Sequence, residues 1–382
     1  ATIPEDDSST KPTYPSDRMG CQIGAGLIPA EVPEIAGAFV QSRDLSASPK
    51  EVDRTNGFSL RAWGTIQPAA DPASTSANAG GGMGHLQPLW LLKYLPNMLA
   101  CHVTILHGTE GPSNTITCSQ ASSLLCIGES CRVIERGDAD ICFSGGAESK
   151  INLVGLSRIH ALGRLAVWPE AIAPETKADF RPDIYPFAPD SKGSAPGEGG
   201  GILLLERADL ALARGATRYA HILGFGSAQS SIQHLPVLAG RSSINMAHAS
   251  KHTKGSKSGL ALAILAALRD ADLTPDAIDA IIPHAIGVPH MDAAELASLR
   301  EVFGPRTDSL PMIALTPIIG DCAAGAGGLQ VAAAALALHH QTLPTHYLAN
   351  KRCPSAPTRL NTILTCSNSL AGQTAAVIAG KA

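Results

Sequence analysis

Short apolar runs that suit buried strands alternate along this chain with segments of helical periodicity. In the first part, a helix-like segment at 121–137 precedes a strand-like run at 139–148, and the run GILLLE at 201–206 leads into another helix. In the second part, a helix at 258–271 precedes a strand with a His-bearing turn at 277–287. Strands that alternate with helices of about 10–15 residues predict a layered α/β fold.

The alternation occurs twice, which indicates two similar halves. We expect a polar, Pro-rich lead-in at 1–18, a first half at 19–215 and a second half at 216–382. The lead-in is expected to be flexible, and it lacks the apolar segment of a signal peptide. Two further segments are expected to be regular, namely a helix at 88–106 and a strand at 312–320.

Charge and composition exclude several kinds of partner. The formal net charge of −4 favours neither nucleic acid nor an anionic membrane surface. Charged residues make up 16% of the chain, below the usual share of about 25%, so we expect a large core or a surface covered by another subunit. No apolar run approaches the roughly 20 residues that a membrane-spanning helix needs.

The nine cysteines are scattered and show no paired spacing. This pattern predicts buried free thiols in a reducing compartment, and hence a cytoplasmic protein. The chain contains no metal-ligand spacing, phosphate loop or dinucleotide fingerprint. We therefore expect neither a metal nor a cofactor.

The most informative segment is GPSNTITCSQASSLLCIGESCRVIERGDADICFSGGAES, at 111–149. A strand rich in β-branched residues ends near Cys118, a sharp turn follows at Gln120, and a helix of small residues begins. This is the pattern of a nucleophile elbow, in which the residue at the turn lies at a helix N-terminus. The helix dipole there favours negative charge and would lower the pKa of a cysteine thiol.

Several motifs in and after this segment occur together. The chain has IGESCRVIERGDAD at 127–140, SGGAE at 144–148, GEGGG at 197–201 and HILGFGSA at 221–228. With these motifs it resembles the β-ketoacyl-acyl-carrier-protein synthases of the thiolase superfamily, over nearly its whole length. The resemblance implies a five-layer α-β-α-β-α fold made of two similar halves. The family's first strand and helix, which precede the strand at 19–28, are not visible.

Family synthases use a cysteine, two histidines and a lysine. Counted back from Gly137 of the GDAD motif, the cysteine position holds Gln120. The first histidine is kept as His284 in PHAIGVPHMD, and the lysine position falls on Thr316. The second histidine, in the Gly-His motif of the family, falls on Asp321.

These exchanges remove the chemistry of condensation. A glutamine amide is not a nucleophile, so Gln120 cannot hold an acyl chain as a thioester. A carboxylate at Asp321 would repel the negative charge that develops when a malonyl group loses CO₂. We therefore expect a pseudoenzyme, in which His284 is either a hydrogen-bond donor to a substrate or a structural relic.

The Gly-rich gating loop of the family corresponds to residues 369–374. Its gating phenylalanine is replaced by Leu370, and Gly372 is the one usual glycine that is kept. The resemblance places Ser369, Leu370 and Gly372 at the substrate. It also implies that Glu198 and Asp292 are structural carboxylates that anchor loops near the site.

Two groups within the family carry glutamine at the nucleophile position. Chain length factors pair with an active ketosynthase, discard the other catalytic groups and shape the acyl tunnel in fatty acid or polyketide synthesis. Decarboxylating ketosynthases act on malonyl-acyl carrier protein and keep both histidines. The losses at Thr316 and Asp321 favour the chain length factor type, with the malonyl decarboxylase as the alternative. An acyltransferase with a different nucleophile, such as Cys118, is a further alternative.

The resemblance implies two macromolecular partners. One is a second ketosynthase-fold chain, in a heterodimer or a homodimer, which pairs through the strand before the elbow near Asn114–Cys118. The other is acyl carrier protein. The sequence specifies neither the acyl chain length nor the pathway.

Overall fold

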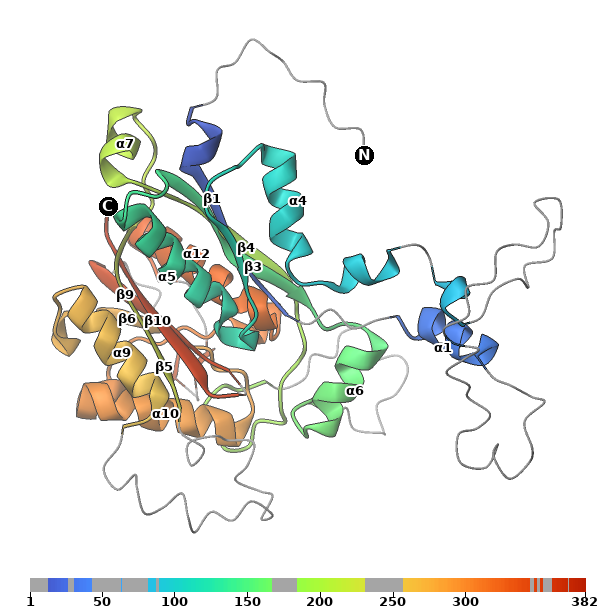
Figure 1. Cartoon of the computed structure of the whole chain (residues 1–382). Coiled ribbons are helices and arrows are strands. Elements are labelled where there is room, and N and C mark those ends of the chain that lie inside the picture. Colours follow the sequence, from blue (N-terminus) through green and yellow to red (C-terminus); the bar gives the residue numbers. More distant parts are fainter. Residues whose placement is uncertain are drawn as a thin grey trace.

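The computed structural model describes residues 13–26, 31–42, 63, 82–86, 89–166, 184–230, 257–343, 347–348, 351–352, 359–369 and 371–382. Two β-sheets alternate with helices in these residues, and the stack has five layers (Figure 1). This is the α-β-α-β-α arrangement expected from the sequence.

The first sheet has the strand order β2 (Ser113–Ile116), β1 (Met19–Ala25), β3 (Ile141–Ser149) and β4 (Glu198–Glu206). Strand β1 is parallel to β2 and β3, whereas β4 is antiparallel to β3. The carboxyl ends of the three parallel strands therefore meet at one edge of the sheet. Loops that follow parallel strands at such an edge commonly form ligand sites.

The second sheet has the order β5 (His221–Gln229), β10 (Gln373–Gly380), β9 (Thr362–Asn368) and β6 (Ala280–Ile282). Strand β6 is parallel to β9, and β10 is antiparallel to both β9 and β5. Strands β1, β3 and β4 of the first sheet thus have the same order and the same relative directions as β6, β9 and β10 of the second. Two similar halves explain this match. Strands β7 (Tyr347–Leu348) and β8 (Lys351–Arg352) form a separate small pair.

Helices α5 (Ser122–Glu135) and α12 (Ala326–His340) form the layer between the two sheets (Figure 1). Helix α4 (Met98–His107) covers the outer face of the first sheet, and α9 (Gly259–Asp270) with α10 (Pro289–Phe303) covers that of the second. The shorter helices are α1 (Val32–Gln41), α6 (Leu153–Ala161), α7 (Ala208–Ala213) and α11 (Thr316–Ile319). None of the described helices has the length and apolar character needed to cross a membrane.

Strand β10 is buried on both faces because helices cover each of them. Ala375 and Val377 pack with Leu124 and Ile127 of α5, whereas Ala376 and Ile378, which alternate with them, belong to the cluster of Ile264 on α9. The alternation follows from the two-residue period of a strand. Burial of a large aliphatic side chain contributes about 1.5–3 kcal/mol, so these strands hold the fold together.

The central helix α12 packs unusually close to the first sheet because glycines face each other. A Cβ atom on Gly201 of β4 would lie 2.4 Å from the carbonyl carbon of Gly328. Alanine at either position would force the helix away from the sheet, so the contact requires glycine. The GEGGG motif therefore positions the loop that precedes α12.

Two expected elements differ from the structure. The expected helix at 88–106 is a 3₁₀ turn, Trp90–Tyr94, followed by α4 from Met98, because Pro96 cannot occupy a helix interior. The expected strand at 312–320 is reduced to one bridge between Met312 and Ile281. Pro317 at the start of α11 then favours a helical turn over extended pairing.

The two halves differ at the outer face of β4. Ile202 and Leu204 point away from the central helices and are 47% and 54% exposed. On β10, which matches β4 in the second half, Ala376 and Ile378 lie beneath α9 and are fully buried. No described helix gives β4 the cover that α9 gives β10.

Candidate active site

The elbow joins β2 to α5 through a strained turn. Ser119 has a φ of 51°, in the left-handed region that residues other than glycine rarely adopt. The Ser122 hydroxyl stabilises this turn, since it accepts a hydrogen bond from the Cys118 N–H at 2.8 Å and donates one to the Ser119 carbonyl at 2.6 Å. The next residue, Gln120, is thereby placed at the start of the helix, as the sequence predicts.

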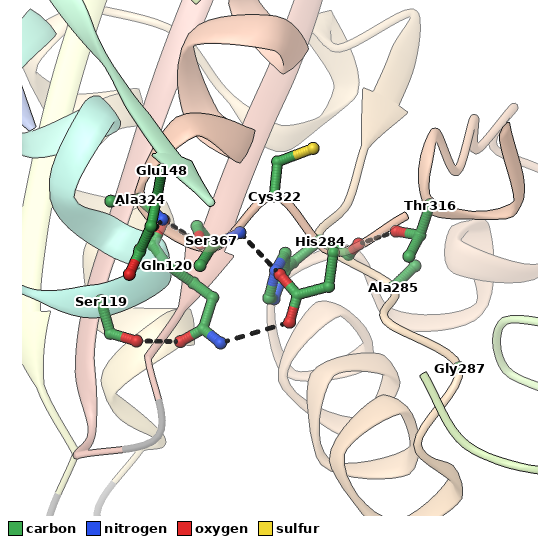
Figure 2. A network of polar contacts seen from close by, with 12 residues as sticks. Ser119, Gln120, Glu148, His284, Ala285, Gly287, Thr316, Cys322, Ala324 and Ser367 are labelled. Carbon is green, nitrogen blue, oxygen red and sulfur yellow. Dashed lines mark hydrogen bonds and ion pairs between the residues drawn. The ribbon is translucent and has the colours of Figure 1, made fainter. Parts of the chain in front are cut away.

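Gln120 is buried, and both ends of its amide have a polar neighbour (Figure 2). Its Oε1 accepts a hydrogen bond from the Ser119 hydroxyl at 2.7 Å. Its Nε2 lies 3.5 Å from Oδ2 of Asp321. Its main-chain carbonyl accepts a hydrogen bond from the Ser367 hydroxyl at 2.9 Å, which joins β9 to the elbow.

The structure brings together the four positions inferred from the resemblance. His284 Nε2 lies 3.6 Å from Oδ1 of Asp321. The Thr316 hydroxyl donates to the His284 carbonyl at 3.0 Å and so supports the histidine loop from behind (Figure 2). Gln120 and His284 thus flank the same carboxylate, which lies where the resemblance places a second histidine.

Two buried carboxylates fix the histidine loop. Glu295 accepts hydrogen bonds from the main-chain N–H groups of His284 and Ala285, both at 2.8 Å. Asp292 accepts from the N–H groups of Phe187 at 3.0 Å and Gly287 at 3.1 Å. The anchoring role expected of Asp292 is therefore present in the structure.

Burial changes the protonation of both anchors. It raises the pKa of Asp292 to about 7, and nearby Glu295 contributes in the same direction. It also raises the pKa of Glu295. Oδ1 of Asp292 has no hydrogen-bond partner among the described residues, so this oxygen is the one on which a proton can reside.

Asp321 has the opposite shift. Burial by itself raises its pKa, but His284 and then Arg164 outweigh that effect and hold the pKa well below its usual value. Its Oδ1 also accepts a hydrogen bond from the Ala323 N–H at 2.9 Å. A carboxylate with these neighbours is ionised at neutral pH.

Arg164 is a residue of the site that the sequence did not reveal. It follows α6, is only 6% exposed, and its Nη2 lies 3.7 Å from Oδ2 of Asp321. It belongs to none of the motifs that carry the resemblance. The only local sign is an arginine within an otherwise apolar stretch, ALGRLA, and such a residue is buried only with a partner.

The gating-loop positions form the turn between β9 and β10. The Gly372 N–H donates to the Ser369 carbonyl at 3.0 Å, and Gly372 has a φ of 90° that favours glycine. The Ser369 hydroxyl donates to Oε1 of Gln373 at 2.8 Å. Leu370, the third position placed at the substrate, lies outside the described residues.

Burial opposes ionisation of the thiols near the elbow. Cys118 is partly buried against the apolar cluster around Leu124, and burial raises its pKa. Cys126 on α5 is fully buried, and its pKa rises to about 12. Within the described residues, no group of three or more His, Cys, Asp or Glu side chains could hold a metal ion.

A cavity of about 480 Å³ opens near the ends of β1 and β3 and the start of β4. Apolar groups make up most of its wall, with Glu148 and Glu198 as the acidic members. Its described lining does not include Gln120, His284 or Asp321. It is lined by Gly26, Leu99, Ala147, Glu148, Ser149, Glu198, Gly199 and Gly200.

Two relatives are similar in sequence to more than half of this chain. A mitochondrial 3-oxoacyl-[acyl-carrier-protein] synthase from Arabidopsis thaliana is 30% identical over 295 residues, which cover 71% of this chain and 58% of the relative. The 3-oxoacyl-[acyl-carrier-protein] synthase 2 of Staphylococcus aureus is 27% identical over 257 residues, covering 67% of this chain and 58% of the relative. The chain thus spans less than two thirds of the length of these relatives.

Two solved structures share the thiolase-like ketosynthase fold. A chain from the complex of a type II polyketide synthase acyl carrier protein with its ketosynthase has a TM-score of 0.69 at 17% identity, covering 98% of this chain and 80% of that chain. A chain from the ishigamide ketosynthase/chain length factor has a TM-score of 0.65 at 22% identity, covering 96% of this chain and 76% of that chain. These likenesses confirm the expected fold class.

Family models agree with the motifs found in the sequence. The N-terminal domain of beta-ketoacyl synthase matches residues 63–211, and the C-terminal domain of beta-ketoacyl synthase matches residues 235–349. The two matches cover the elbow, the GEGGG motif, the histidine loop and the loop of Asp321. By its motifs, its five-layer fold and these matches, the chain belongs to the β-ketoacyl synthase family.

Proposed function

We propose that this chain is a condensation-inactive ketosynthase-like subunit of the chain length factor type, which pairs with an active ketosynthase and helps to shape the acyl tunnel. One observation carries the proposal. At the elbow, the buried amide of Gln120 lies between the Ser119 hydroxyl and the Asp321 carboxylate. Gln120 has neither a thiol nor a hydroxyl with which it could form an acyl intermediate.

The surroundings of Gln120 oppose the second half-reaction as well. Loss of CO₂ from a malonyl group produces an enolate that needs hydrogen-bond donors or positive charge. Asp321 presents a carboxylate there instead, and Thr316 is hydrogen-bonded to the His284 main chain. These two features favour a subunit role over malonyl decarboxylation, although Gln120 and His284 keep the decarboxylase as the second candidate.

The surface beside the elbow supports pairing with a second ketosynthase-fold chain. Strand β2 lies at the edge of the first sheet, with β1 as its neighbour. Helix α4 packs on β2, and its last turn exposes Ile105 and Leu106. Leu89 ahead of α4 is exposed as well. No described strand pairs with the outer edge of β2, and a strand edge bordered by apolar side chains is the kind of surface that a subunit covers.

Acyl carrier protein is the other proposed partner. One similar solved structure is that of a type II polyketide synthase acyl carrier protein with its ketosynthase. In a heterodimer, the carrier would deliver its chain to the active partner, while this chain would supply part of the tunnel wall. The cytoplasm is the compartment in which we place the assembly.

The first experiment asks whether the chain accepts an acyl group. The purified chain is incubated with acyl carrier protein that carries a fatty acyl group, and the intact mass is recorded. We expect no adduct, because Gln120 is not a nucleophile. A stable adduct that disappears in Cys118→Ala would establish Cys118 as the nucleophile and would overturn the proposal.

The second experiment asks whether a ketosynthase binds the chain. The chain is co-expressed with a candidate partner ketosynthase that has an intact catalytic cysteine, and the complex is isolated by size exclusion. We expect a stoichiometric heterodimer whose product chain length depends on this subunit. CO₂ release from malonyl carrier protein by the chain alone, lost in Gln120→Ala and His284→Ala, would instead assign the decarboxylase function.

A further inference from the structure

Arg164 is a buried cation whose hydrogen bonds are incomplete. Its Nε and Nη2 atoms have no hydrogen-bond acceptor among the described residues, and the nearest opposite charge is Asp321. Burial lowers the pKa of the guanidinium, and Asp321 counteracts that shift. A buried charge costs several kcal/mol of solvation unless a counter-ion compensates it. Asp321 therefore supplies the opposite charge that the buried guanidinium of Arg164 requires.

Backbone bridges hold the pair in place from both sides of one segment. The Arg164 carbonyl accepts a hydrogen bond from the Ser194 N–H at 2.7 Å. On the other side, the Asp321 N–H donates to the Ala195 carbonyl at 2.8 Å, and the Gly197 N–H donates to the Asp321 carbonyl at 2.9 Å. The main chains of the two charged residues are thus held on either side of the same segment.

Glycines make this close arrangement possible. Gly320, just before Asp321, has a φ of 72°, and a Cβ atom there would lie 2.7 Å from Cα of Gly197. Gly193 has a φ of 124°, and a Cβ atom there would lie 2.8 Å from the Arg164 carbonyl oxygen. Any larger residue at these two positions would push the bridges apart. The local backbone is therefore built around the pair.

The carboxylate of Asp321 faces the elbow as well as Arg164. Oδ2 lies 3.7 Å from Arg164 Nη2 and 3.5 Å from Gln120 Nε2, and Oδ1 lies 3.6 Å from His284 Nε2. Arg164 and Gln120 thus approach the same oxygen. A change in charge at either end of the Arg164–Asp321 pair must alter the electrostatic potential at position 120.

We propose that Arg164 is a positioning residue of this site: it is the counter-ion of Asp321, and the pair fixes the carboxylate beside Gln120 and His284 while offsetting part of its negative charge. This role of Arg164 rests on the proposed function and extends it, because it explains how a carboxylate can replace a histidine in a ketosynthase fold. It follows that Asp321→His alone would leave Arg164 as an unpaired buried cation.

The test uses an introduced thiol as a probe of charge. Gln120→Cys places a titratable group at the elbow, and its pKa is measured from the pH dependence of iodoacetamide alkylation, followed by fragment-resolved peptide mass spectrometry. Asp321→Asn in this background should lower the thiol pKa by at least about one unit, a tenfold change in the thiolate-to-thiol ratio. Arg164→Met should raise it by a similar amount. Arg164→Lys keeps the charge and should restore the original pKa.

The control is Arg158→Met, which removes an exposed arginine from the preceding helix α6 and should leave the profile unchanged. An unchanged thiol pKa in Arg164→Met would overturn the inference. If that variant fails to fold, Asp321→Asn decides the matter, since the inference requires its thiol pKa to fall. These measurements use the isolated chain, so they are independent of whether the proposed partner binds.

Discussion

At the residue scale, the site differs from a ketosynthase in charge as well as in its nucleophile. Gln120 lies at the position that the resemblance assigns to the cysteine, and it offers only a neutral amide. Asp321, held ionised by His284 and Arg164, offers a negative charge where the resemblance implies a histidine. In the proposed function, each half-reaction is therefore opposed by a different side chain. A single substitution should not restore the whole cycle.

Gln120→Cys should restore acylation without condensation. The smaller thiol fits the space of the amide, and the helix N-terminus favours its thiolate. We expect an acyl adduct with loaded carrier protein but no β-ketoacyl product. Lack of one enolate-stabilising donor costs about 2.7–4 kcal/mol of transition-state stabilisation. Intact mass records the first step, and product analysis records the second. Efficient condensation by this variant would show that Thr316 and Asp321 do not limit the reaction.

Asp292 should make the chain more stable as the pH falls from about 8 to about 5. Its folded pKa is about 7, above the unfolded value near 3.9, so the folded state binds a proton that the unfolded state releases. The cost of burying the ionised Asp292 carboxylate is fully present above its folded pKa, and it disappears as the pH falls toward its unfolded pKa. The free energy of unfolding should therefore rise by up to about 1.4 kcal/mol per pH unit in this window.

Urea unfolding at a series of pH values measures this dependence. Asp292→Asn mimics the protonated carboxyl and keeps an oxygen for the N–H groups of Phe187 and Gly287. It should flatten the slope. An equally steep slope in this variant would assign the effect to Glu295, whose pKa burial also raises.

At the element scale, the join between β2 and α5 determines where the site residue lies. Ser119 adopts a φ that costs conformational energy, and the hydroxyl of Ser122 offsets that cost by bonding both Cys118 and Ser119. The motif spacing correctly predicted a turn here. The hydrogen bonds that close it involve a serine that no motif singled out.

Ser122→Ala should lower the free energy of unfolding by about 1–3 kcal/mol, because it leaves the partly buried Cys118 N–H without its acceptor. Chemical denaturation monitors the change. Ser144→Ala on β3 is a matched control, since that buried hydroxyl has no hydrogen-bond partner among the described residues. Its substitution removes a buried polar group that has no partner, so the free energy of unfolding should not fall. Equal losses in both variants would contradict the role assigned to Ser122.

At the scale of the whole molecule, the two halves share strand directions but not the same cover. The face of β10 that carries Ile378 lies beneath α9, whereas the matching face of β4 exposes Ile202 and Leu204. Apolar burial is the main favourable term in folding. Substitution of apolar residues at matching positions in the two halves should therefore change the free energy of unfolding by different amounts.

Ile378→Ala should cost about 2–5 kcal/mol, because it opens a cavity between β10 and α9. Leu204→Ala should change the free energy of unfolding of the isolated chain by no more than about 0.5 kcal/mol, because Leu204 is 54% exposed. Thermal or urea unfolding of the two variants checks the contrast. A large loss in Leu204→Ala would mean that this face is covered in solution.

The sequence by itself determined the layered α/β fold, the position of the elbow and the identity of the residue on it. The layers and the turn depend on local patterns, namely strand and helix periodicity, whereas Gln120 was found by counting from Gly137 in motifs that resemble those of the β-ketoacyl synthases. The same resemblance indicated His284, Thr316 and Asp321, which the structure brings together. Pro96 and Pro317 also act locally, but the expected helix at 88–106 and the expected strand at 312–320 did not take them into account.

Only the tertiary structure decided what surrounds those residues. The pairing of Arg164 with Asp321 joins two segments through backbone bridges on either side of Ser194–Gly197, and no periodicity records such a contact. The protonation of Asp292 and Asp321 likewise depends on burial and neighbouring charge, which produce opposite shifts in two carboxylates of the same type. Chain-local patterns specify elements, whereas the electrostatics of a site arises from groups that meet only after folding.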